Sequence, residues 1–309
     1  MQRLYRWPSL LLGLAALFWA GNTVAARLAI DEISPLTLTA LRWVMVAAVL
    51  WPVYGREIRR HWPQIRPRLA LIVLLALLGM TGFNALYYVA AHDTSAINIA
   101  ILQGAMPIFV LAGAYLAHGS RAGLVEQLGV FITALGVAVV ATRGAPQSIL
   151  QMEFNQGDLV MLAACVLYAL YTVALRDRPN MPAVPFFALL ALIAAITSLP
   201  LVALEVMAGA FRLPTAQGLA VTVWIAVFPS FLSQIFYLRG VDLIGPGRAG
   251  VFVNLVPVFA AVLAVGLISE PFAPYHGAAL ILVVGGIWLA QRRGKVPEAA
   301  HRKTPPNGP

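Results

Sequence analysis

Long runs of apolar residues, separated by short polar segments, recur along almost the whole chain. Ten of these runs are long enough to cross the roughly 30 Å hydrocarbon core of a membrane as a helix. We place them at residues 9–29, 35–54, 69–91, 95–117, 123–142, 157–175, 183–205, 217–238, 246–268 and 273–291. None alternates apolar and polar residues in the way of a transmembrane β-strand. The pattern predicts an all-α membrane protein with ten transmembrane helices.

The composition excludes the main soluble classes of protein. The 309 residues are 61% hydrophobic and 11% charged, with a mean hydropathy of +0.83, whereas soluble domains carry about 25% charged residues. A soluble enzyme of this length would need more charge at its surface, and a disordered chain would need lower hydrophobicity. Because Cys165 is the single cysteine, the chain has no disulfide framework.

The basic residues predict how the helices are oriented. With the N-terminus in the cytoplasm, 17 of the 21 Lys and Arg residues fall in cytoplasmic segments, and only Arg27, Arg143 and Arg212 fall in outer ones. This asymmetry follows the positive-inside rule and, with an even number of helices, places both termini in the cytoplasm. It also accounts for the net charge of +9 without a nucleic-acid partner. The polar, basic residues 292–309 are expected to form a disordered cytoplasmic tail.

The two halves of the chain resemble each other at an offset of 149–150 residues. The residues matched at this offset include Tyr87 with Tyr237, Pro107 with Pro257, Phe109 with Phe259, and Gly136 with Gly286. Because each half holds five helices, an odd number, the second half must enter the membrane from the opposite side. The sequence therefore predicts two inverted five-helix repeats, residues 1–143 and 157–291. Such repeats are typical of transporters whose substrate site lies at the repeat interface near mid-membrane.

Several short motifs add a resemblance to a known family. They are Phe18-Trp19-Ala20-Gly21-Asn22, Ser34-Pro35, Leu41-Arg42, the segments around Pro107 and Pro257, Ser269-Glu270-Pro271 and Gly285-Gly286. With these motifs the chain resembles the ten-helix, EamA-type exporters of the drug/metabolite transporter superfamily, and within it is similar to the bacterial YddG-like amino-acid exporters. The resemblance implies a basket of two inverted halves around a central cavity, with helices five and ten at the periphery. It also implies export of small metabolites, most directly amino acids, across the bacterial inner membrane.

Polar and aromatic residues recur three positions apart in four of the predicted helices, which places each pair on one helix face. The pairs are Trp19 and Asn22, Asn84 and Tyr87, Tyr168 and Tyr171, and Gln234 and Tyr237, with Tyr88 beside the second pair. A ring beside a hydrogen-bonding group suits a small amphipathic solute, so we predict that these residues bind the substrate. Polar contact between helices and a place in the interfacial aromatic belt are the alternative roles.

Three prolines stand near the middle of predicted helices. Pro107 and Pro257 stand at equivalent positions of the two halves, and Pro229 lies in the eighth helix. A proline removes the hydrogen bond to the carbonyl four residues earlier and bends the helix, which would free the carbonyls of Gln103 and Val253. We predict that the bends act as hinges and line the cavity, although plain packing kinks are the alternative. The polar and soft side chains beside them, also predicted to contact the substrate, are Gln103, Met106 and Asn254.

One charged residue lies well within a predicted helix. Arg42 is seven residues into the second helix, roughly 10 Å deep at 1.5 Å per residue. It could attract a substrate carboxylate, or reach the outer interface and pair with Asp31 or Glu32. Since it matches a superfamily hallmark shared by members with different substrates, a structural role is the favoured interpretation. No carboxylate occupies the middle of a span, so facilitated transport is predicted rather than proton coupling through a buried acid.

The sequence carries no motif of an enzyme, of an ATPase or of a metal site. We therefore expect a monomeric transporter in the lipid bilayer, without cofactor or metal, whose partner is a small-molecule substrate. The alternatives left open are a multidrug exporter of cationic compounds, a membrane enzyme acting on lipid-linked substrates, and a channel.

Overall fold

The computed structural model describes residues 7–119, 123–145 and 155–291. Within them, ten helical spans are long and apolar enough to cross a membrane, and there is no β-strand. Spans 1 to 10 are, in chain order, Pro8–Leu28, Pro35–Arg60, Trp62–Asp93, Ala96–His118, Leu124–Ala141, Gln156–Asp177, Ala183–Met207, Ala216–Ile244, Arg248–Ile268 and Pro274–Gln291. The prediction of ten apolar helices is confirmed. The predicted tail, residues 292–309, lies outside the described residues.

Five spans are single helices and five are composite. The single helices are α1 (Pro8–Leu28), α2 (Pro35–Arg60), α8 (Leu124–Ala141), α11 (Ala183–Met207) and α16 (Pro274–Gln291). Span 3 consists of α3 (Trp62–Ile65), η2 (Arg66–Arg68), α4 (Leu69–Ala76), η3 (Leu77–Gly82) and α5 (Phe83–Asp93), and span 4 of α6 (Ala96–Leu102), η4 (Gln103–Ala105) and α7 (Met106–His118). The remaining elements are α10 (Gln156–Ala174) and η5 (Leu175–Asp177) in span 6, α12 (Ala216–Ile225), η6 (Ala226–Leu232) and α13 (Ser233–Ile244) in span 8, and α14 (Pro246–Val253) and α15 (Leu255–Ile268) in span 9.

Spans 2, 3 and 8 are longer than the sequence predicted. The apolar run of span 2 ends at Tyr54, but α2 continues to Arg60. Hydropathy reports where a segment leaves apolar surroundings, whereas a helix ends where its hydrogen bonds end. Arginine and glutamate are good helix formers, so residues 56–60 extend the helix beyond the apolar run.

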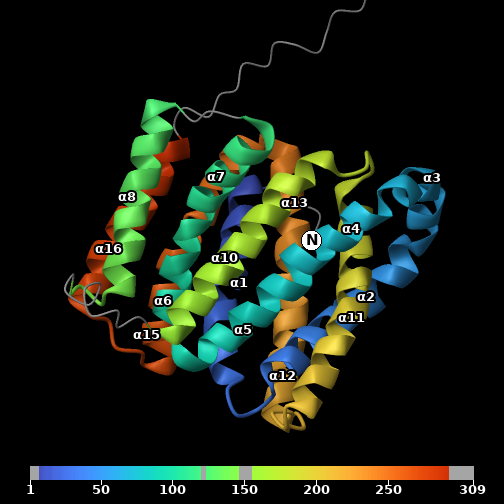
Figure 1. The fold of residues 1–309 in the computed structure, drawn as a ribbon, viewed down its shortest axis with the longest axis horizontal. Coiled ribbons are helices and arrows are strands. Elements are labelled where there is room, and N and C mark those ends of the chain that lie inside the picture. The colour runs from blue at the N-terminus through green and yellow to red at the C-terminus, as the bar shows by residue number, and fades with distance from the viewer. Residues whose placement is uncertain (1–6, 120–122, 146–154, 292–309) are drawn as a thin grey trace, which may run out of the picture.

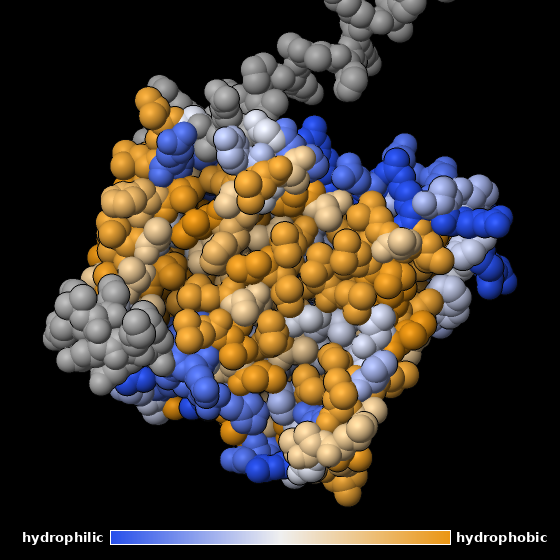
Figure 2. All heavy atoms as spheres, viewed as in Figure 1, coloured by the Kyte–Doolittle hydropathy of each residue, from blue (hydrophilic) through white to orange (hydrophobic). Residues whose placement is uncertain are grey.

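The spans run alternately in opposite directions, so the described loops gather at two faces of the molecule (Figure 1). One face, called the arginine-rich face, carries Arg56, Arg59, Arg60, Arg66, Arg68, Arg176, Arg178, Arg239 and Arg248 near its span ends. The other, called the carboxylate face, carries Asp31, Glu32, Asp93, Asp158, Glu205 and Glu270 together with Arg27, Arg143 and Arg212. Figure 2 shows a broad hydrophobic band between hydrophilic rims, as expected of a protein that spans a bilayer.

Spans from opposite halves of the chain pair with one another. α2 packs along α11 at one end of the molecule, and α8 packs along α16 at the other end (Figure 1). Between these pairs, α1 contacts α13 and α15, and α10 contacts α5 and α7. The pairings are unchanged when each span is exchanged with the one five places away in the chain, which is the symmetry that the predicted repeat requires. Spans 5 and 10 lie at the periphery, as the family resemblance implies.

Spans that the predicted repeat relates to each other are distorted at matching places. Spans 3 and 8 each contain a π-helical turn, η3 and η6. Span 4 is interrupted by the 3-10 turn η4 just before Pro107, and span 9 is interrupted at Asn254, three residues before Pro257. Turns of these kinds make backbone groups available to other partners and are frequent at functional sites.

The peripheral pair of α8 and α16 is held by close backbone contact. A Cβ atom on Gly129 would stand 2.4 Å from the amide nitrogen of Ala290, and one on Gly286 would stand 2.6 Å from the Gly129 carbonyl oxygen. Small residues let helices approach closely inside a membrane, where the hydrophobic effect does not drive helices together. This pair is thus packed on itself, and the inner spans are left to form the centre of the molecule.

Candidate functional site: a central cavity with one closed end

The inner spans enclose a cavity of about 490 Å³, a volume within the range of small-molecule sites. Its wall combines aromatic, amide, hydroxyl and apolar groups. Towards the arginine-rich face the lining reaches Gly250 and Gln291, near the ends of spans 9 and 10. Towards the carboxylate face it stops at Ala100 and Arg42, inside spans 4 and 2. The cavity therefore opens towards the arginine-rich face and ends below the carboxylate face.

Most of the predicted substrate residues lie in the cavity wall. These are Trp19, Asn22, Asn84, Tyr87, Gln103, Met106, Tyr168, Gln234, Tyr237 and Asn254, together with the three prolines Pro107, Pro229 and Pro257. Tyr88 and Tyr171 lie behind the wall. The hydroxyl of Tyr88 donates to Asn22 Oδ1 at 3.0 Å, and the ring of Tyr171 packs against Gly79. Substrate contact by the lining residues, and hinge motion at the prolines, stay predictions.

The expectation that each proline frees a backbone carbonyl is wrong for Gln103. Its carbonyl accepts a hydrogen bond from the amide of Met106, because the backbone tightens into the 3-10 turn η4. Such a turn satisfies a carbonyl that would otherwise lose its partner to the proline. The first proline bend therefore offers side chains, rather than this carbonyl, to the cavity.

Arg42 is the only charged residue among the described residues that line the cavity. Only 6% of its surface is exposed. Its Nε donates to the hydroxyl of Ser230 at 2.6 Å. Its Nη1 donates to Asn84 Oδ1 at 2.5 Å and to the Tyr88 hydroxyl at 2.6 Å. The guanidinium carbon also lies 5.0 Å from the ring centroid of Trp43, within cation–π range. A cage of neutral groups thus holds the guanidinium.

The two π-helical turns position this cage. In η6, the Ser230 hydroxyl donates onward to the Ile225 carbonyl at 2.6 Å, so its oxygen is left to accept from the arginine. In η3, the Met80 carbonyl accepts from Asn84 Nδ2 at 2.6 Å and from Trp43 Nε1 at 3.2 Å. These bonds turn the amide oxygen of Asn84 towards the guanidinium. The π-helical turns of spans 3 and 8 therefore both position hydrogen-bond acceptors for the buried charge of Arg42.

The alternative in which Arg42 pairs with Asp31 or Glu32 is wrong. Asp31 pairs with Arg212, and Glu32 accepts from the hydroxyl of Thr215, both on the carboxylate face. Arg42 lies deeper, and no described carboxylate comes within 4.0 Å of it. A charge at the centre of a membrane helix costs about 2.5–3.5 kcal/mol in insertion measurements. Arg42 therefore makes the hydrogen bonds expected of a structural residue, but its charge has no counter-charge among the described residues.

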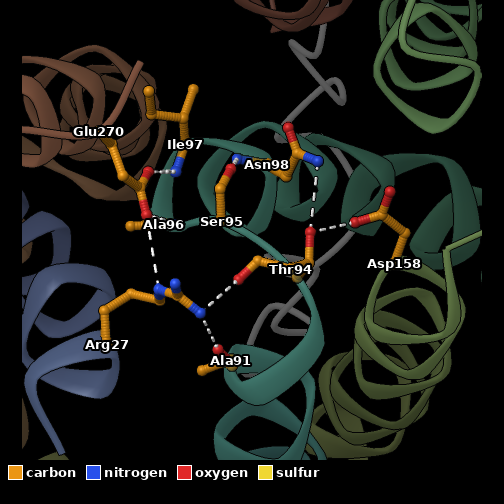
Figure 3. Close-up of polar contacts among 9 residues, drawn as sticks. All are labelled: Arg27, Ala91, Thr94, Ser95, Ala96, Ile97, Asn98, Asp158 and Glu270. Atoms are coloured by element: carbon orange, nitrogen blue, oxygen red, sulfur yellow. Dashed lines mark hydrogen bonds and ion pairs between the residues drawn. The ribbon is translucent and has the colours of Figure 1, made fainter. Parts of the chain in front are cut away.

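The carboxylate face is closed by a polar cluster around Glu270 (Figure 3). The Glu270 carboxylate accepts from the amides of Ala96 at 2.9 Å and Ile97 at 3.2 Å, in the first turn of α6. Arg27 pairs with Glu270, with 3.6 Å between Nε and Oε1, and donates to the Ala91 carbonyl at 2.7 Å. A carboxylate is favourable at a helix N-terminus, where backbone amides lack partners. The cluster ties spans 1, 3 and 4 to the end of span 9.

A chain of hydrogen bonds runs beside this cluster to Asp158, and Figure 3 shows its last steps. His276 Nδ1 accepts from the Ala273 amide at 3.0 Å, which in the neutral ring leaves the proton on Nε2, 3.2 Å from Asn98 Oδ1. Asn98 Nδ2 donates to the Thr94 hydroxyl at 3.3 Å, and Thr94 donates to Asp158. Asp158 is only 2% exposed, so this carboxylate is buried although it lies near the end of a helix.

A second buried carboxylate closes the same face at span 2. Glu205, near the end of α11, accepts from the Leu36 amide at 3.0 Å and from the Thr37 amide at 3.1 Å. The Thr37 hydroxyl donates to it as well, at 2.7 Å. Like Glu270, this side chain caps the first turn of a helix from another span.

Comparison with known proteins identifies the family. The sequence pattern of the EamA-like transporter family matches residues 6–142 and, a second time, residues 155–291. The chain belongs to this family.

Its relatives carry transporter names. The uncharacterized transporter YyaM of Bacillus subtilis is 24% identical over 305 residues, with 94% of each chain covered. An uncharacterized transporter of Archaeoglobus fulgidus is 25% identical, covering 91% of this chain and 96% of its own. The uncharacterized inner membrane transporter YedA of Escherichia coli K12 is 23% identical, covering 88% and 87%. The EamA-like chain is thus a multi-pass membrane transporter, which confirms the suspected drug/metabolite transporter superfamily.

A solved crystal structure shares the fold of this EamA-like transporter. It superimposes with a TM-score of 0.62 at 18% identity, over 92% of this chain and 96% of its own. The match supports the ten-helix architecture and carries no information on substrate. Within the described residues, no group of three or more His, Cys, Asp and Glu side chains could hold a metal ion.

Sequence reasoning missed several residues of this EamA-like site. The cavity wall also contains Trp43, Phe83, Thr172, Ser230 and Gln291. One signal was available, since Ser230 stands 149 positions after Thr81 and so keeps a hydroxyl at the repeat spacing. Glu205 offered no local signal, because its partners lie 168–169 positions away. Glu270 stands in the Ser269-Glu270-Pro271 motif, but the motif does not reveal its partners, which lie 173–174 positions away.

Proposed function

We propose that this EamA-like transporter exports small metabolites, amino acids first among them, across the bacterial inner membrane by alternating access. The observation that carries the proposal is the cavity itself, which reaches the arginine-rich face and is closed below the carboxylate face. A central site with one open and one closed end is what alternating access requires. The relative named as an inner membrane transporter supports the choice of membrane.

The orientation follows from the distribution of arginine. The positive-inside rule assigns the arginine-rich face to the cytoplasm, so both termini are cytoplasmic and the described state receives substrate from the cytoplasm. Export then requires the arginine-rich face to close and the carboxylate face to open. Two inverted halves provide this second state when they exchange conformations. The proposed hinges are the breaks before Pro107 and Pro257 and the π-turn that contains Pro229.

The chemistry of the wall suits an amino acid. Rings from both halves line the cavity in pairs, with 5.3 Å between the centroids of Trp19 and Tyr237 and 5.0 Å between those of Phe83 and Tyr168. Amide side chains stand among them. The described carboxylates lie at the span ends and not in the wall, so transport is facilitative in this proposal.

Uptake into proteoliposomes tests the proposal. Labelled amino acids are offered to the purified protein with and without a pH gradient, and we expect uptake of several neutral amino acids at a rate indifferent to the gradient. A rate that follows the gradient would keep the transporter and replace facilitation by proton coupling. Uptake of cationic dyes in place of amino acids would favour a multidrug exporter, and uptake of neither would reject the proposal.

Two cavity variants test the map of the site. Tyr168→Ala and Gln103→Ala each remove a lining group and are expected to reduce uptake by about fivefold or more, equivalent to roughly 1 kcal/mol. Membrane insertion and elution volume should not change. Tyr115→Ala is the matched control, because Tyr115 is 55% exposed and lies outside the wall. Wild-type uptake by both cavity variants would show that the map is wrong.

A further inference from the structure

Arg42 brings a positive charge into the cavity wall without a negative partner in the part of the chain that the structure describes. The described carboxylates of the closed end do not pair with Arg42, and Asp158 among them accepts from Thr94. Glu270 holds Arg27 and the first turn of α6, and Glu205 holds the first turn of α2. The described residues thus supply Arg42 with hydrogen-bond acceptors but with no counter-charge.

One end of the guanidinium has no partner among the described residues. The hydrogen bonds of Arg42 use Nε and Nη1, and no described residue accepts from Nη2. The donors of a guanidinium are fixed in one plane, so the bonds to Ser230, Asn84 and Tyr88 also fix the direction of Nη2. Because the side chain lines the cavity and the described residues use only Nε and Nη1, two N–H donors and a positive charge remain available at this part of the wall.

We propose that Arg42 binds the carboxylate of the transported solute, an inference that rests on the transport function proposed above. Arginine favours carboxylates, through charge and paired donors. Arg42 lies at the closed end of the cavity, so the carboxylate enters first, and the rings of Trp19 and Tyr237 surround the rest of the solute. The site thereby selects zwitterionic and anionic solutes. A cationic solute is disfavoured because it meets a like charge at the same depth.

The first test changes the solute and leaves the protein intact. Intrinsic tryptophan fluorescence, to which the wall residues Trp19 and Trp43 contribute, is followed while wild-type protein is titrated with alanine, leucine and threonine, and with the C-terminal amide of each. Two further probes are 4-methylpentanoate, which has the carboxylate alone, and 3-methylbutylamine, which has the amine alone. Carboxylates should bind about tenfold or more tighter than the matched amides and amine, given the usual strength of hydrogen bonds to charged groups. Equal binding would overturn the proposal.

The second test changes the arginine. Arg42→Gln should bring the acid-to-amide affinity ratio to about one, and Arg42→Lys should keep part of the preference because it keeps the charge. Gln103→Ala is the matched control, since it alters a neutral wall residue and should weaken acids and amides alike, leaving their ratio unchanged. A ratio that survives in Arg42→Gln would overturn the proposal. If that variant fails to fold, as judged by its elution profile, the lysine variant and the wild-type series decide.

Flux measurements separate this proposal from the proposed function. Uptake of acids and amides at equal rates would keep the transporter and reject the role of Arg42. Preferential binding of carboxylates without uptake of any solute would keep the role of Arg42 and reject transport. Neither binding nor uptake of any carboxylate would overturn both.

Discussion

The two halves of span 4 differ sharply in packing. All seven residues of α6, next to the carboxylate face, are buried, whereas α7, which runs to the arginine-rich face, has no buried residue. Span 9 shows the same contrast, because α15 buries five residues and α14 buries only Ala249 among its described side chains. The same two spans are therefore tightly packed at the closed end of the cavity and open at the other end.

This difference in packing between the two ends indicates which contacts keep the cavity closed. At the closed end, Glu270 and Glu205 reach across to cap helices of other spans. At the open end, the contacts between spans include Arg68 with the Asp177 carbonyl, and Asn254 with Gln291 at 3.2 Å. Hydrogen bonds to carboxylates can be exchanged for water, whereas interlocked apolar side chains must repack. We therefore expect Glu270, which also pairs with Arg27, to set the balance between the two states, and Glu205 to contribute mainly to stability.

Replacing Glu270 by alanine should break the closed end and have the largest effect. The change removes the acceptor of two α6 amides and the partner of Arg27. Hydrogen bonds to charged groups contribute about 1.5–3 kcal/mol each, so the population open at the carboxylate face should rise about tenfold or more. The measurement is labelling of a cysteine at position 103, in a Cys165→Ala background, by an impermeant maleimide applied to the carboxylate face.

Glu126→Ala is the matched control for this experiment. Glu126 also caps a helix, accepting from the Gly123 amide at 3.3 Å, but it does so at the start of α8 on the arginine-rich face and away from the cavity. Its loss should leave the labelling unchanged. Equal labelling in the Glu270 and Glu126 variants would show that Glu270 does not hold the closed end.

Much of the fold and of the cavity wall could be predicted because both depend on local pattern. The length of an apolar run gives a span, and a spacing of three residues gives a shared helix face. The offset between the halves then singles out pairs such as Tyr87 with Tyr237, which both reach the wall. Side chains on one helix face tend to point in the same direction, so their spacing in the sequence indicates which of them line the cavity together.

The closing contacts could not be predicted, because they join distant parts of the chain. Arg42 meets Ser230 across 188 positions, and Glu270 meets Ala96 across 174. Position within a helix also says little about burial, since Glu205 is 3% exposed although it lies near the end of its span. Such contacts depend on how the helices pack, which no local pattern in a single sequence specifies.

Replacing Glu205 by alanine should lower the stability of the protein with little effect on access to the cavity from the carboxylate face. Glu205 lies on α11, which packs with α2 at the end of the molecule, and its loss uncaps Leu36 and Thr37. We expect a loss of about 1–2 kcal/mol in stability, as for other N-caps, seen as a lower Tm in detergent. Labelling at position 103 should change less than about threefold. Glu205→Gln keeps an acceptor and should lose about half as much stability. If Glu205→Ala were labelled more than Glu270→Ala, the contact at span 2 would be the one that keeps the cavity closed.

Asp158→Asn asks whether a carboxylate of the closed end carries protons or only holds structure. One oxygen of Asp158 accepts from Thr94, and Oδ2 has no hydrogen-bond partner within the described residues. Asparagine keeps an acceptor for Thr94, so uptake should stay within about twofold of wild type and should ignore a pH gradient in both proteins. A wild-type rate that follows the gradient, beside a variant rate that does not, would instead identify Asp158 as a proton carrier.

Arg212→Ala should have the smallest effect, although it breaks the other ion pair of the carboxylate face. The side chains of Arg212 and Asp31 are 60% and 74% exposed, and exposed pairs contribute about 0–1 kcal/mol and are screened by salt. Tm and labelling at position 103 should therefore match the wild type. Arg27→Ala provides the contrast, since Arg27 joins Glu270 to the Ala91 carbonyl and its loss should raise labelling about threefold or more. Wild-type labelling in both arginine variants would show that Arg27, although it pairs with Glu270, contributes no more to keeping this end of the cavity closed than an exposed ion pair does.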